Sequence, residues 1–324
     1  MRRKILLGLA VVASALLTAN ASAQANFPTK PVKIVIPFPP GGGTDIVGRL
    51  IGARLSEQWK QPVIVENRPG ASGNIGADYV ARQPADGYTL LITSAPFAIA
   101  PAVFDNLNFD PVKNFTPITQ IATVPLILVT RPDSPVKNMD DLIALARKDG
   151  EKVTFGSFGN GSPAHLVGES IKQLANVKMT HVPYKGGAAA IPDVVSGQLT
   201  FAVLDAIAIA PLIKSGQLRA LAIMGTKRSP ALPNVPTLAQ SGIAFESVGW
   251  HAIFAPANMP RALAERLNKD INAVSALPEI REKIISGGSI PADPPWTVDT
   301  WTVQFQRDVQ TWGDIARKSG AKND

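Results

Sequence analysis

The 324-residue sequence contains no cysteine and only three histidines. Without cysteine no disulfide and no thiolate zinc site can form, so the stability of the fold has to come from packing. The histidines, His165, His181 and His251, are widely separated, and none has a second metal ligand at helical spacing. We therefore expect no metal and no cofactor, and a core or surface role for each histidine.

Runs of like charge are missing as well. The formal net charge is +7, of which three charges belong to basic residues at positions 2–4, so the rest of the chain carries +4. Lys and Arg are spread along the sequence without interleaved aromatic residues, which argues against nucleic-acid binding. A mildly positive field of this kind helps to gather anions.

Motifs of nucleotide-binding proteins and serine hydrolases are also absent. Residues 41–46 lack the third glycine of the dinucleotide fingerprint, and no glycine loop ends in Lys-Ser or Lys-Thr. Residues 70–74, Gly-Ala-Ser-Gly-Asn, lack the final glycine of a nucleophile elbow. Because no base can be matched with a nucleophile, we expect no catalytic residues and a protein that is not an enzyme.

The N-terminus has the pattern of a secretory signal peptide. Basic residues precede the apolar stretch 5–17, and an Ala-Ser-Ala triplet ending at Ala23 follows it. The stretch is shorter than the roughly 20 residues that span a bilayer. We expect residues 1–23 to be cleaved off after Ala23. The disulfide-free exported protein, with no cysteine to carry a lipid anchor, then suits a bacterial periplasm.

Strand-like and helix-like segments alternate through the chain, which indicates an α/β protein. Its length and its hydrophobic content of 45% predict two domains. A parallel βαβαβ unit is expected from strands at 32–38, 62–66 and 88–93 and helices at 44–58 and up to 83. A second unit is expected from strands at 152–155, 179–183, 199–204 and 218–224 and helices at 163–174, up to 196 and at 207–214.

Three amphipathic helices, at 260–274, 278–286 and 297–318, complete the chain and are expected to return to the first lobe. Stretches 125–130 and 246–254 are expected to cross between the lobes as a hinge. We place the first lobe at residues 24–125 and 249–324, and the second at residues 126–248.

Each lobe has a glycine-rich loop between a strand and a helix, at residues 39–45 and 156–163. Ligands of open parallel sheets bind beyond the carboxyl ends of the strands, and the first turn of a helix presents free N–H groups to anions. Thr44 and Ser162 are expected to be the N-caps, with Pro163 at the first helical position. An ordinary tight turn is the alternative for either loop.

Several motifs together resemble the solute-binding component of tripartite tricarboxylate transporters, the Bug family of periplasmic receptors. The resemblance covers essentially the whole chain after the signal segment. The motifs that carry it are Phe-Pro-Thr-Lys-Pro-Val at 27–32, the loop 39–45, Val-Glu-Asn-Arg-Pro-Gly at 65–70, Ala-Asp-Gly-Tyr-Thr-Leu-Leu at 85–91, Ser-Pro-Ala-His-Leu at 162–166, His-Val-Pro-Tyr-Lys-Gly at 181–186, Leu-Arg-Ala-Leu-Ala at 218–222 and Lys-Arg-Ser-Pro-Ala-Leu-Pro at 227–233.

This resemblance implies a type II periplasmic-binding-protein fold, with two α/β lobes joined by crossover strands and a ligand cleft between them. It also implies that backbone amides, hydroxyl groups and ordered waters hold a ligand carboxylate, without catalysis. The ligand-binding residues carried over by position are Phe38, Gly42, Gly43, Thr44, Ala71, Ser72, Ser94, Ala95, Ser157, Asn160, Gly161, Ser162, His165, Tyr184, Lys185, Gly186 and Asp205.

Two positions depart from the family pattern. His251 follows Trp250 where the family usually has an aromatic residue, and residues 258–260, Asn-Met-Pro, replace Gly-Thr-Pro. The first change can alter the cleft wall and so the choice of ligand.

For several other side chains the sequence indicates one or two roles. Asp45 can favour the helix N-terminus by its charge, and Asp205 can orient a water or a ligand donor. Lys185 can pair with an anion or stay solvated, Arg68 is expected to organise its own loop, and Phe38 is expected to be an apolar wall, as is Phe97.

The expected function is capture of a small carboxylate, which leaves dicarboxylates, tricarboxylates, acidic amino acids and aromatic acids open. We expect a monomer that hands its ligand to the membrane subunits of a tripartite tricarboxylate transporter. A receptor that signals to a membrane sensor kinase is the alternative, because either partner would read the same surface. An enzyme on the same fold would need a paired base and nucleophile.

Overall fold

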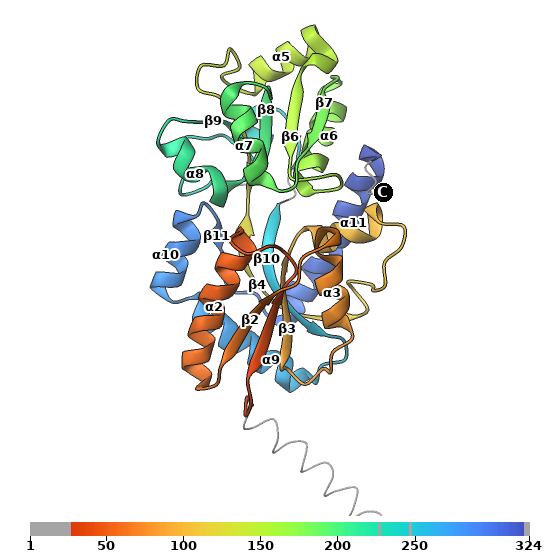
Figure 1. The fold of residues 1–324 in the computed structure, drawn as a ribbon, viewed down its shortest axis with the longest axis vertical. Coiled ribbons are helices and arrows are strands. Elements are labelled where there is room, and N and C mark those ends of the chain that lie inside the picture. The colour runs from red at the N-terminus through yellow and green to blue at the C-terminus, as the bar shows by residue number, and fades with distance from the viewer. Residues whose placement is uncertain (1–26, 226–227, 246–247, 321–324) are drawn as a thin grey trace, which may run out of the picture.

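The computed structural model describes residues 27–225, 228–245 and 248–320. The expected signal segment, residues 1–23, lies outside these residues. Two mixed sheets, each with helices on both faces, form two lobes that are stacked along the long axis of the molecule (Figure 1). The predicted two-lobed α/β fold is confirmed. Among the described helices, none is long and apolar enough to cross a membrane.

Lobe 1 carries a sheet of the order β11-β4-β10-β3-β1-β2. Strands β1, β2 and β3 are parallel, as predicted, whereas β10 is antiparallel to both β3 and β4. The strands are β1 (Val32–Ile36), β2 (Val63–Asn67), β3 (Thr89–Ser94), β4 (Phe115–Val124), β10 (Gly249–Pro256) and β11 (Ile290–Pro291). The helices of this part of the chain are α2 (Gly43–Trp59), η1 (Ala71–Gly73), α3 (Asn74–Ala81), α4 (Pro96–Val103), α9 (Arg261–Ser275), α10 (Pro278–Ser286) and α11 (Val298–Ser319).

Lobe 2 carries a sheet of the order β7-β6-β8-β5-β9. Strand β5 is antiparallel to β8 and β9, and β6 is parallel to β7 and β8. The strands are β5 (Leu126–Thr130), β6 (Thr154–Ser157), β7 (Thr180–Pro183), β8 (Phe201–Asp205) and β9 (Arg219–Ile223). The helices are α5 (Met139–Asp149), η2 (Gly150–Lys152), α6 (Pro163–Ala175), α7 (Gly187–Ser196), α8 (Ala206–Lys214) and η3 (Ala239–Ser241).

Helix α2 lies close to the lobe 1 sheet because two glycines occur in its buried stripe. A Cβ atom on Gly48 would lie 2.8 Å from Cδ1 of Ile36, and one on Gly52 would lie 3.0 Å from Cγ2 of Val65. A larger side chain at either position would push the helix away from the strands. This close packing fixes where the first turn of α2 stands relative to the end of β1.

The connections between the lobes differ from the prediction. Strand β4 was not expected, and it runs into β5 through Pro125, so the crossing is one residue long rather than a strand of its own. The stretch 246–254 was expected to cross as well, but β10 lies in the lobe 1 sheet along its whole length. Pairing on both edges holds it there.

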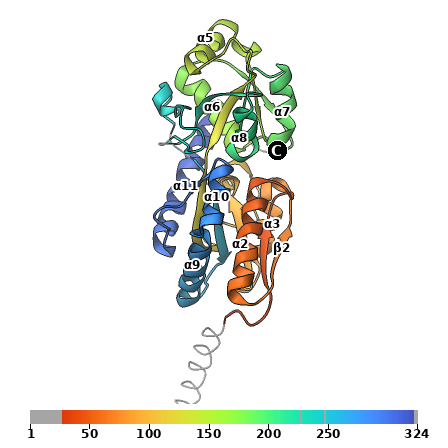
Figure 2. The same cartoon turned by 90° about the vertical axis from the view of Figure 1, so that its left-hand side faces the viewer.

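Helix α11 does not return to lobe 1 alone. It packs on α4 and β4 of lobe 1 and also on α6 of lobe 2, and the side view shows it running along both lobes (Figure 2). The ring of Trp312 on this helix contacts Phe245, with the centroids 6.2 Å apart. A single buried cluster includes Phe97 of lobe 1, Phe155 of lobe 2 and Trp312. One apolar core therefore joins the lobes on the side of α4, α6 and α11.

Candidate functional site

The first glycine loop is held in place by a buried carboxylate. Asp45 accepts hydrogen bonds from the amide of Gly41 at 2.9 Å, Nε of Arg49 at 3.0 Å and Nδ2 of Asn67 at 2.9 Å. Asn67 also donates to the carbonyl of Phe38 at 3.0 Å. Burial disfavours the charge on Asp45, but its three donors outweigh burial and hold the pKa below its ordinary value. Asp45 therefore fixes the conformation of the loop, in addition to lying in the first turn of α2.

The first turn of α2 begins one residue earlier than predicted. Gly42 is the N-cap, with extended backbone (φ −79°, ψ 169°), and no described side chain caps the turn. Thr44, which was expected to be the N-cap, lies inside the first turn and is buried. The first amides of an α-helix have no partner within the helix. The amides of Gly43 and Thr44 are therefore free to bind an anion.

The second loop of lobe 1 packs against the first. A Cβ atom on Gly73 would lie 3.2 Å from Cε1 of Phe38. Ala71 (φ 47°) and Ser72 (φ 56°) both have left-handed backbone, which costs about 1–3 kcal/mol for each residue that is not glycine. Such strain gathers at binding sites, where the surrounding structure maintains it. Both side chains are exposed.

The next strand end of lobe 1 carries Ser94 and Ala95. Ser94 ends β3 and is partly buried, and Ala95 precedes α4 and is buried. Arg68, which was expected to organise its own loop, forms an ion pair with Glu66 and stacks on the ring of Tyr79 with Cζ 3.6 Å from the centroid. The predicted residues of lobe 1 thus lie on three neighbouring strand ends.

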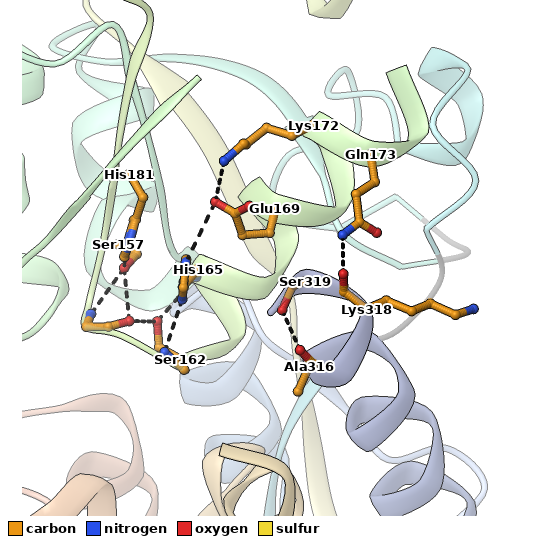
Figure 3. A network of polar contacts seen from close by, with 12 residues as sticks. Ser157, Ser162, His165, Glu169, Lys172, Gln173, His181, Ala316, Lys318 and Ser319 are labelled. Atoms are coloured by element: carbon orange, nitrogen blue, oxygen red, sulfur yellow. Dashed lines mark hydrogen bonds and ion pairs between the residues drawn. The ribbon is translucent and has the colours of Figure 1, made fainter. Parts of the chain in front are cut away.

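The glycine loop of lobe 2 uses its amides internally. Gly159 donates its N–H to Oγ of Ser157 at 3.2 Å, Gly161 donates to Nδ1 of His165 at 3.1 Å, and Ser162 donates to the carbonyl of Gly159 at 3.2 Å. These three amides are not available to a ligand, contrary to the expectation of free N–H groups at this loop, because Ser157, His165 and the carbonyl of Gly159 accept them. Figure 3 shows this network beside the end of α11. Ser162 is the N-cap of α6, as predicted, and accepts from the amide of His165.

Two of the three histidines form an uncharged layer under this loop. The rings of His165 and His181 stack with centroids 3.9 Å apart, and Nε2 of His181 lies 2.7 Å from Oγ of Ser157. Burial, aided by His165 and Lys172, lowers the pKa of His181 to about 3. Burial also lowers the pKa of His165. His165 therefore supports the loop from within the lobe.

The remaining predicted residues of lobe 2 lie on adjoining turns. The amide of Tyr184 donates to the carbonyl of Ser157 at 3.0 Å, and its hydroxyl donates to Asp193 at 2.5 Å. Asn160 and Lys185 are exposed. Gly186 (φ 102°) is the N-cap of α7.

Asp205 stands at the end of β8 and is the N-cap residue of α8, but its side chain caps no amide. It is partly buried. Burial raises the pKa of its carboxyl group to about 6. The adjoining residue, Ala206, touches lobe 1: a Cβ atom on Gly288 would lie 2.8 Å from the Cβ of Ala206.

The lobes also meet at the glycine loop of lobe 2. A Cβ atom on Gly161 (φ 68°) would lie 3.2 Å from the Cβ of Val103, the last residue of α4 in lobe 1. The structure thus gathers the predicted residues into two sets, one on each lobe, and Gly161 brings the second set against lobe 1. No group of three or more His, Asp or Glu side chains that could hold a metal occurs among the described residues.

A cavity of about 300 Å³ lies away from these loops, between β4, α9 and α11. None of the predicted ligand-binding residues lines it. Arg261 on its rim is bound through two nitrogens to Asp299, at 2.5 and 2.8 Å, and also to Glu265. With its charge shared between two carboxylates, Arg261 offers little attraction to an anion.

Two buried polar residues were not among the predicted contacts. His251 is 3% exposed and Ser289 is 1% exposed, and Nδ1 of the first and Oγ of the second have no hydrogen-bond partner among the described residues. The sequence signalled His251 only as a departure from the family pattern. Nothing in the sequence pointed to Ser289.

Known proteins resemble this chain over nearly its whole length. The protein BugT of Bordetella pertussis is 33% identical over 320 residues, which cover 97% of this chain and 98% of BugT. Among solved structures, the R. palustris protein Rpa4515 with adipate has a TM-score of 0.83 at 33% identity and covers 91% of this chain and 99% of its own.

Two further structures have the same fold. The periplasmic binding protein BugD has a TM-score of 0.81 at 31% identity, with 92% of this chain and 100% of BugD covered. MatC from Rhodopseudomonas palustris, with bound malate, has a TM-score of 0.79 at 27% identity, with coverage of 90% and 100%.

The family described as "Tripartite tricarboxylate transporter family receptor" matches residues 47–320. Its members are receptors rather than enzymes. With this match, the chain belongs to the receptor family of the tripartite tricarboxylate transporters.

Proposed function

We propose that this receptor captures a small carboxylate between the loops of its two lobes. The observation that carries the proposal is the open first turn of α2, where Gly42 is the N-cap and no described side chain satisfies the amides that follow. Each helix end favours an anion by about 0.3–1 kcal/mol, and more where it is partly buried. Asp45 fixes this turn in advance, so little ordering is needed on binding.

The ligands of two similar proteins narrow the class to be tested first. Rpa4515 is described with adipate and MatC with malate, and both ligands carry two carboxylates. We infer that a dicarboxylate is also the class that suits this chain. One carboxylate would bind the amides of Gly43 and Thr44, with Ser72 and Ser94 beside it.

The second lobe would complete the site from the other side. The predicted residues of this lobe with exposed or partly buried side chains are Asn160, Tyr184, Lys185 and Asp205, and the hydroxyl of Tyr184 is already bonded to Asp193. Ser157, Ser162 and His165 are buried. Ser157 and Ser162 both donate to the carbonyl of Gly159, and Ser162 accepts from the amide of His165, so we assign the three residues to holding the loop in shape. The ligand would then meet a surface that is already formed.

The family indicates the setting in which the receptor works. We propose that the chain is exported to the periplasm with cleavage after Ala23, and that it delivers its ligand to the membrane subunits of a tripartite tricarboxylate transporter. The intact mass of the exported protein should lack the first 23 residues.

A thermal-shift screen of the exported protein tests the proposed function. Dicarboxylates, tricarboxylates, acidic amino acids and aromatic acids form the panel, with neutral sugars and metal ions as controls. A ligand at 100 times its dissociation constant stabilises the folded state by about 2.7 kcal/mol, which shifts the melting temperature by several degrees. Stabilisation by sugars or metal ions alone would contradict the proposal.

A further inference from the structure

The buried ring of His251 has a nitrogen without a partner. Its side chain is 3% exposed, and Nδ1 forms no hydrogen bond with any described residue. A buried polar atom that is left unsatisfied lowers the stability of the fold, so native proteins rarely keep one without a use. Ser289, 1% exposed, has an unpartnered hydroxyl as well. The neutral imidazole of His251 can donate a hydrogen bond from one ring nitrogen and accept one at the other.

The face of the sheet on which His251 lies follows from the residues around it in β10. Trp250 and Phe254 belong to the core shared by the two lobes, whereas Ile253 belongs to the core under α2. Side chains alternate along a strand, so His251 lies on the face of Ile253. That is the face covered by α2, α9 and α10.

On this face His251 stands at the end nearest lobe 2. It pairs with Ser94, the last residue of β3, which is one of the predicted ligand-binding residues. Leu90 and Ile92 of the same strand pack in the core under α2, so Ser94 shares their face. The first residues of the buried stripe of α2, Thr44 and Asp45, mark the corresponding end of the helix. His251 is thus buried at the same end of this face as the proposed carboxylate position.

The chemistry of a partner at this depth is limited by charge. Burial lowers the pKa of His251 to about 4, so the ring is neutral at neutral pH. No charged side chain of the described residues donates to it, and a second carboxylate placed there would lose its hydration without a cation to replace it. A neutral hydroxyl avoids this cost and can donate to, or accept from, the imidazole.

We propose that His251 determines ligand specificity by hydrogen-bonding a hydroxyl group that lies next to the carboxylate held by α2. The inference rests on the proposed function, because it takes the α2 turn as the carboxylate position. The class of ligand is then a hydroxylated di- or tricarboxylate rather than its deoxy counterpart. A site built around a buried polar group penalises an analogue that leaves this group unpaired.

Calorimetry with pairs of acids that differ by one hydroxyl tests the inference. The pairs are malate and succinate, 2-hydroxyglutarate and glutarate, and citrate and tricarballylate. For the pair that fits the site, the parent protein should bind the hydroxylated member about three- to tenfold more tightly, as for one neutral hydrogen bond. In His251→Phe, which keeps the ring shape without the nitrogens, the two members should bind within about twofold of each other.

Two controls separate the hydrogen bond from packing. His251→Gln keeps a donor and an acceptor and should restore part of the preference, whereas Ile253→Val changes the volume on the same face and should leave the preference unchanged. Ring nitrogen shifts in NMR spectra give a direct readout. The chain has three histidines, and only the signal that is missing in His251→Phe should move with ligand.

The outcomes distinguish the inference from the proposed function. If none of the carboxylates in the screen binds, the proposed function fails. If carboxylates bind but the parent shows no preference for the hydroxylated member, or His251→Phe keeps that preference, or the His251 signal does not respond, the inference about His251 is overturned while carboxylate capture stands.

Discussion

At the scale of one residue, Asp205 shows how a group that is proposed to bind ligand lowers the stability of the empty protein. Burial raises its pKa to about 6, and no cation among the described residues compensates the charge. The unfolded chain releases this proton near pH 4, so between about pH 4 and 6 the folded state holds a proton that the unfolded state has lost. The contribution of Asp205 to stability therefore falls as the pH rises through this window.

Asp205→Asn should accordingly stabilise the ligand-free protein at pH 7 by about 1–3 kcal/mol and have little effect at pH 4. It should also weaken carboxylate binding, because the group that orients a water or ligand donor is changed. Urea unfolding at both pH values measures the first effect, and calorimetry the second. Asp308→Asn is the matched control for binding, since burial raises the pKa of Asp308 to about 6 as well, on α11. Equal stabilisation of Asp205→Asn at pH 4 and pH 7 would contradict this account.

Single residues were predictable from the sequence where the signal was local. Ser162 before Pro163 has the composition of an N-cap, and the structure confirms it. Thr44 is also of a residue type that favours the N-cap position, but three glycines precede it, and the helix starts at Gly43 instead. Which amides stay free depends on the folded conformation of the loop, in which Gly161 donates to His165 and Gly159 donates to Ser157, and the residue types alone do not fix that conformation.

At the scale of elements, the glycine loop of lobe 2 joins binding to contact between the lobes. Gly161 has φ 68° and little room for a side chain, because a Cβ atom would lie 3.2 Å from the Cβ of Val103 in α4. Gly43, by contrast, is not among the glycines with positive φ, so a side chain there would not strain the backbone. The two loops thus need glycine for different reasons.

Gly161→Ala should weaken carboxylate binding several-fold, because the added methyl group pushes the loop away from α4. Gly216→Ala is a matched control: Gly216 has φ 75° but nothing within 4 Å of the added atom. Left-handed backbone costs a residue with a side chain roughly 1–2 kcal/mol, so both variants should lose similar stability. Calorimetry and thermal unfolding of the two proteins give the comparison. An equal loss of affinity in both variants would show that strain, and not the contact between lobes, is responsible.

Most elements were predictable from their period, including α7 and α8, which each contain a proline. The expected parallel strands and helices lie within a few residues of their predicted positions, whereas α4 and α5 were not expected. Strand β4 contains Pro117 and is followed by Pro125, and proline within a run argues against a strand. The bulges opposite β10 accommodate this irregular strand. The period of the sequence also predicted the apolar stripe of α11, but it did not predict that this stripe packs on both lobes.

At the scale of the whole molecule, the two lobes are attached to each other differently on their two sides. A continuous core with α4, α6 and α11 joins them on one side, whereas the predicted ligand loops lie at strand ends of the two sheets. A ligand that touches both sets of loops would favour the arrangement in which they approach, by its difference in affinity for the two states. The shared core with Trp312 then marks the side about which the lobes would pivot.

A crystal structure of the mature protein with a saturating dicarboxylate tests the central claim most directly. We predict a carboxylate within hydrogen-bonding distance of the amides of Gly43 and Thr44, with lobe 2 residues closing on the rest of the ligand. The cavity between β4, α9 and α11 should stay free of ligand. A dicarboxylate bound in that cavity, with the first turn of α2 unoccupied, would contradict the account.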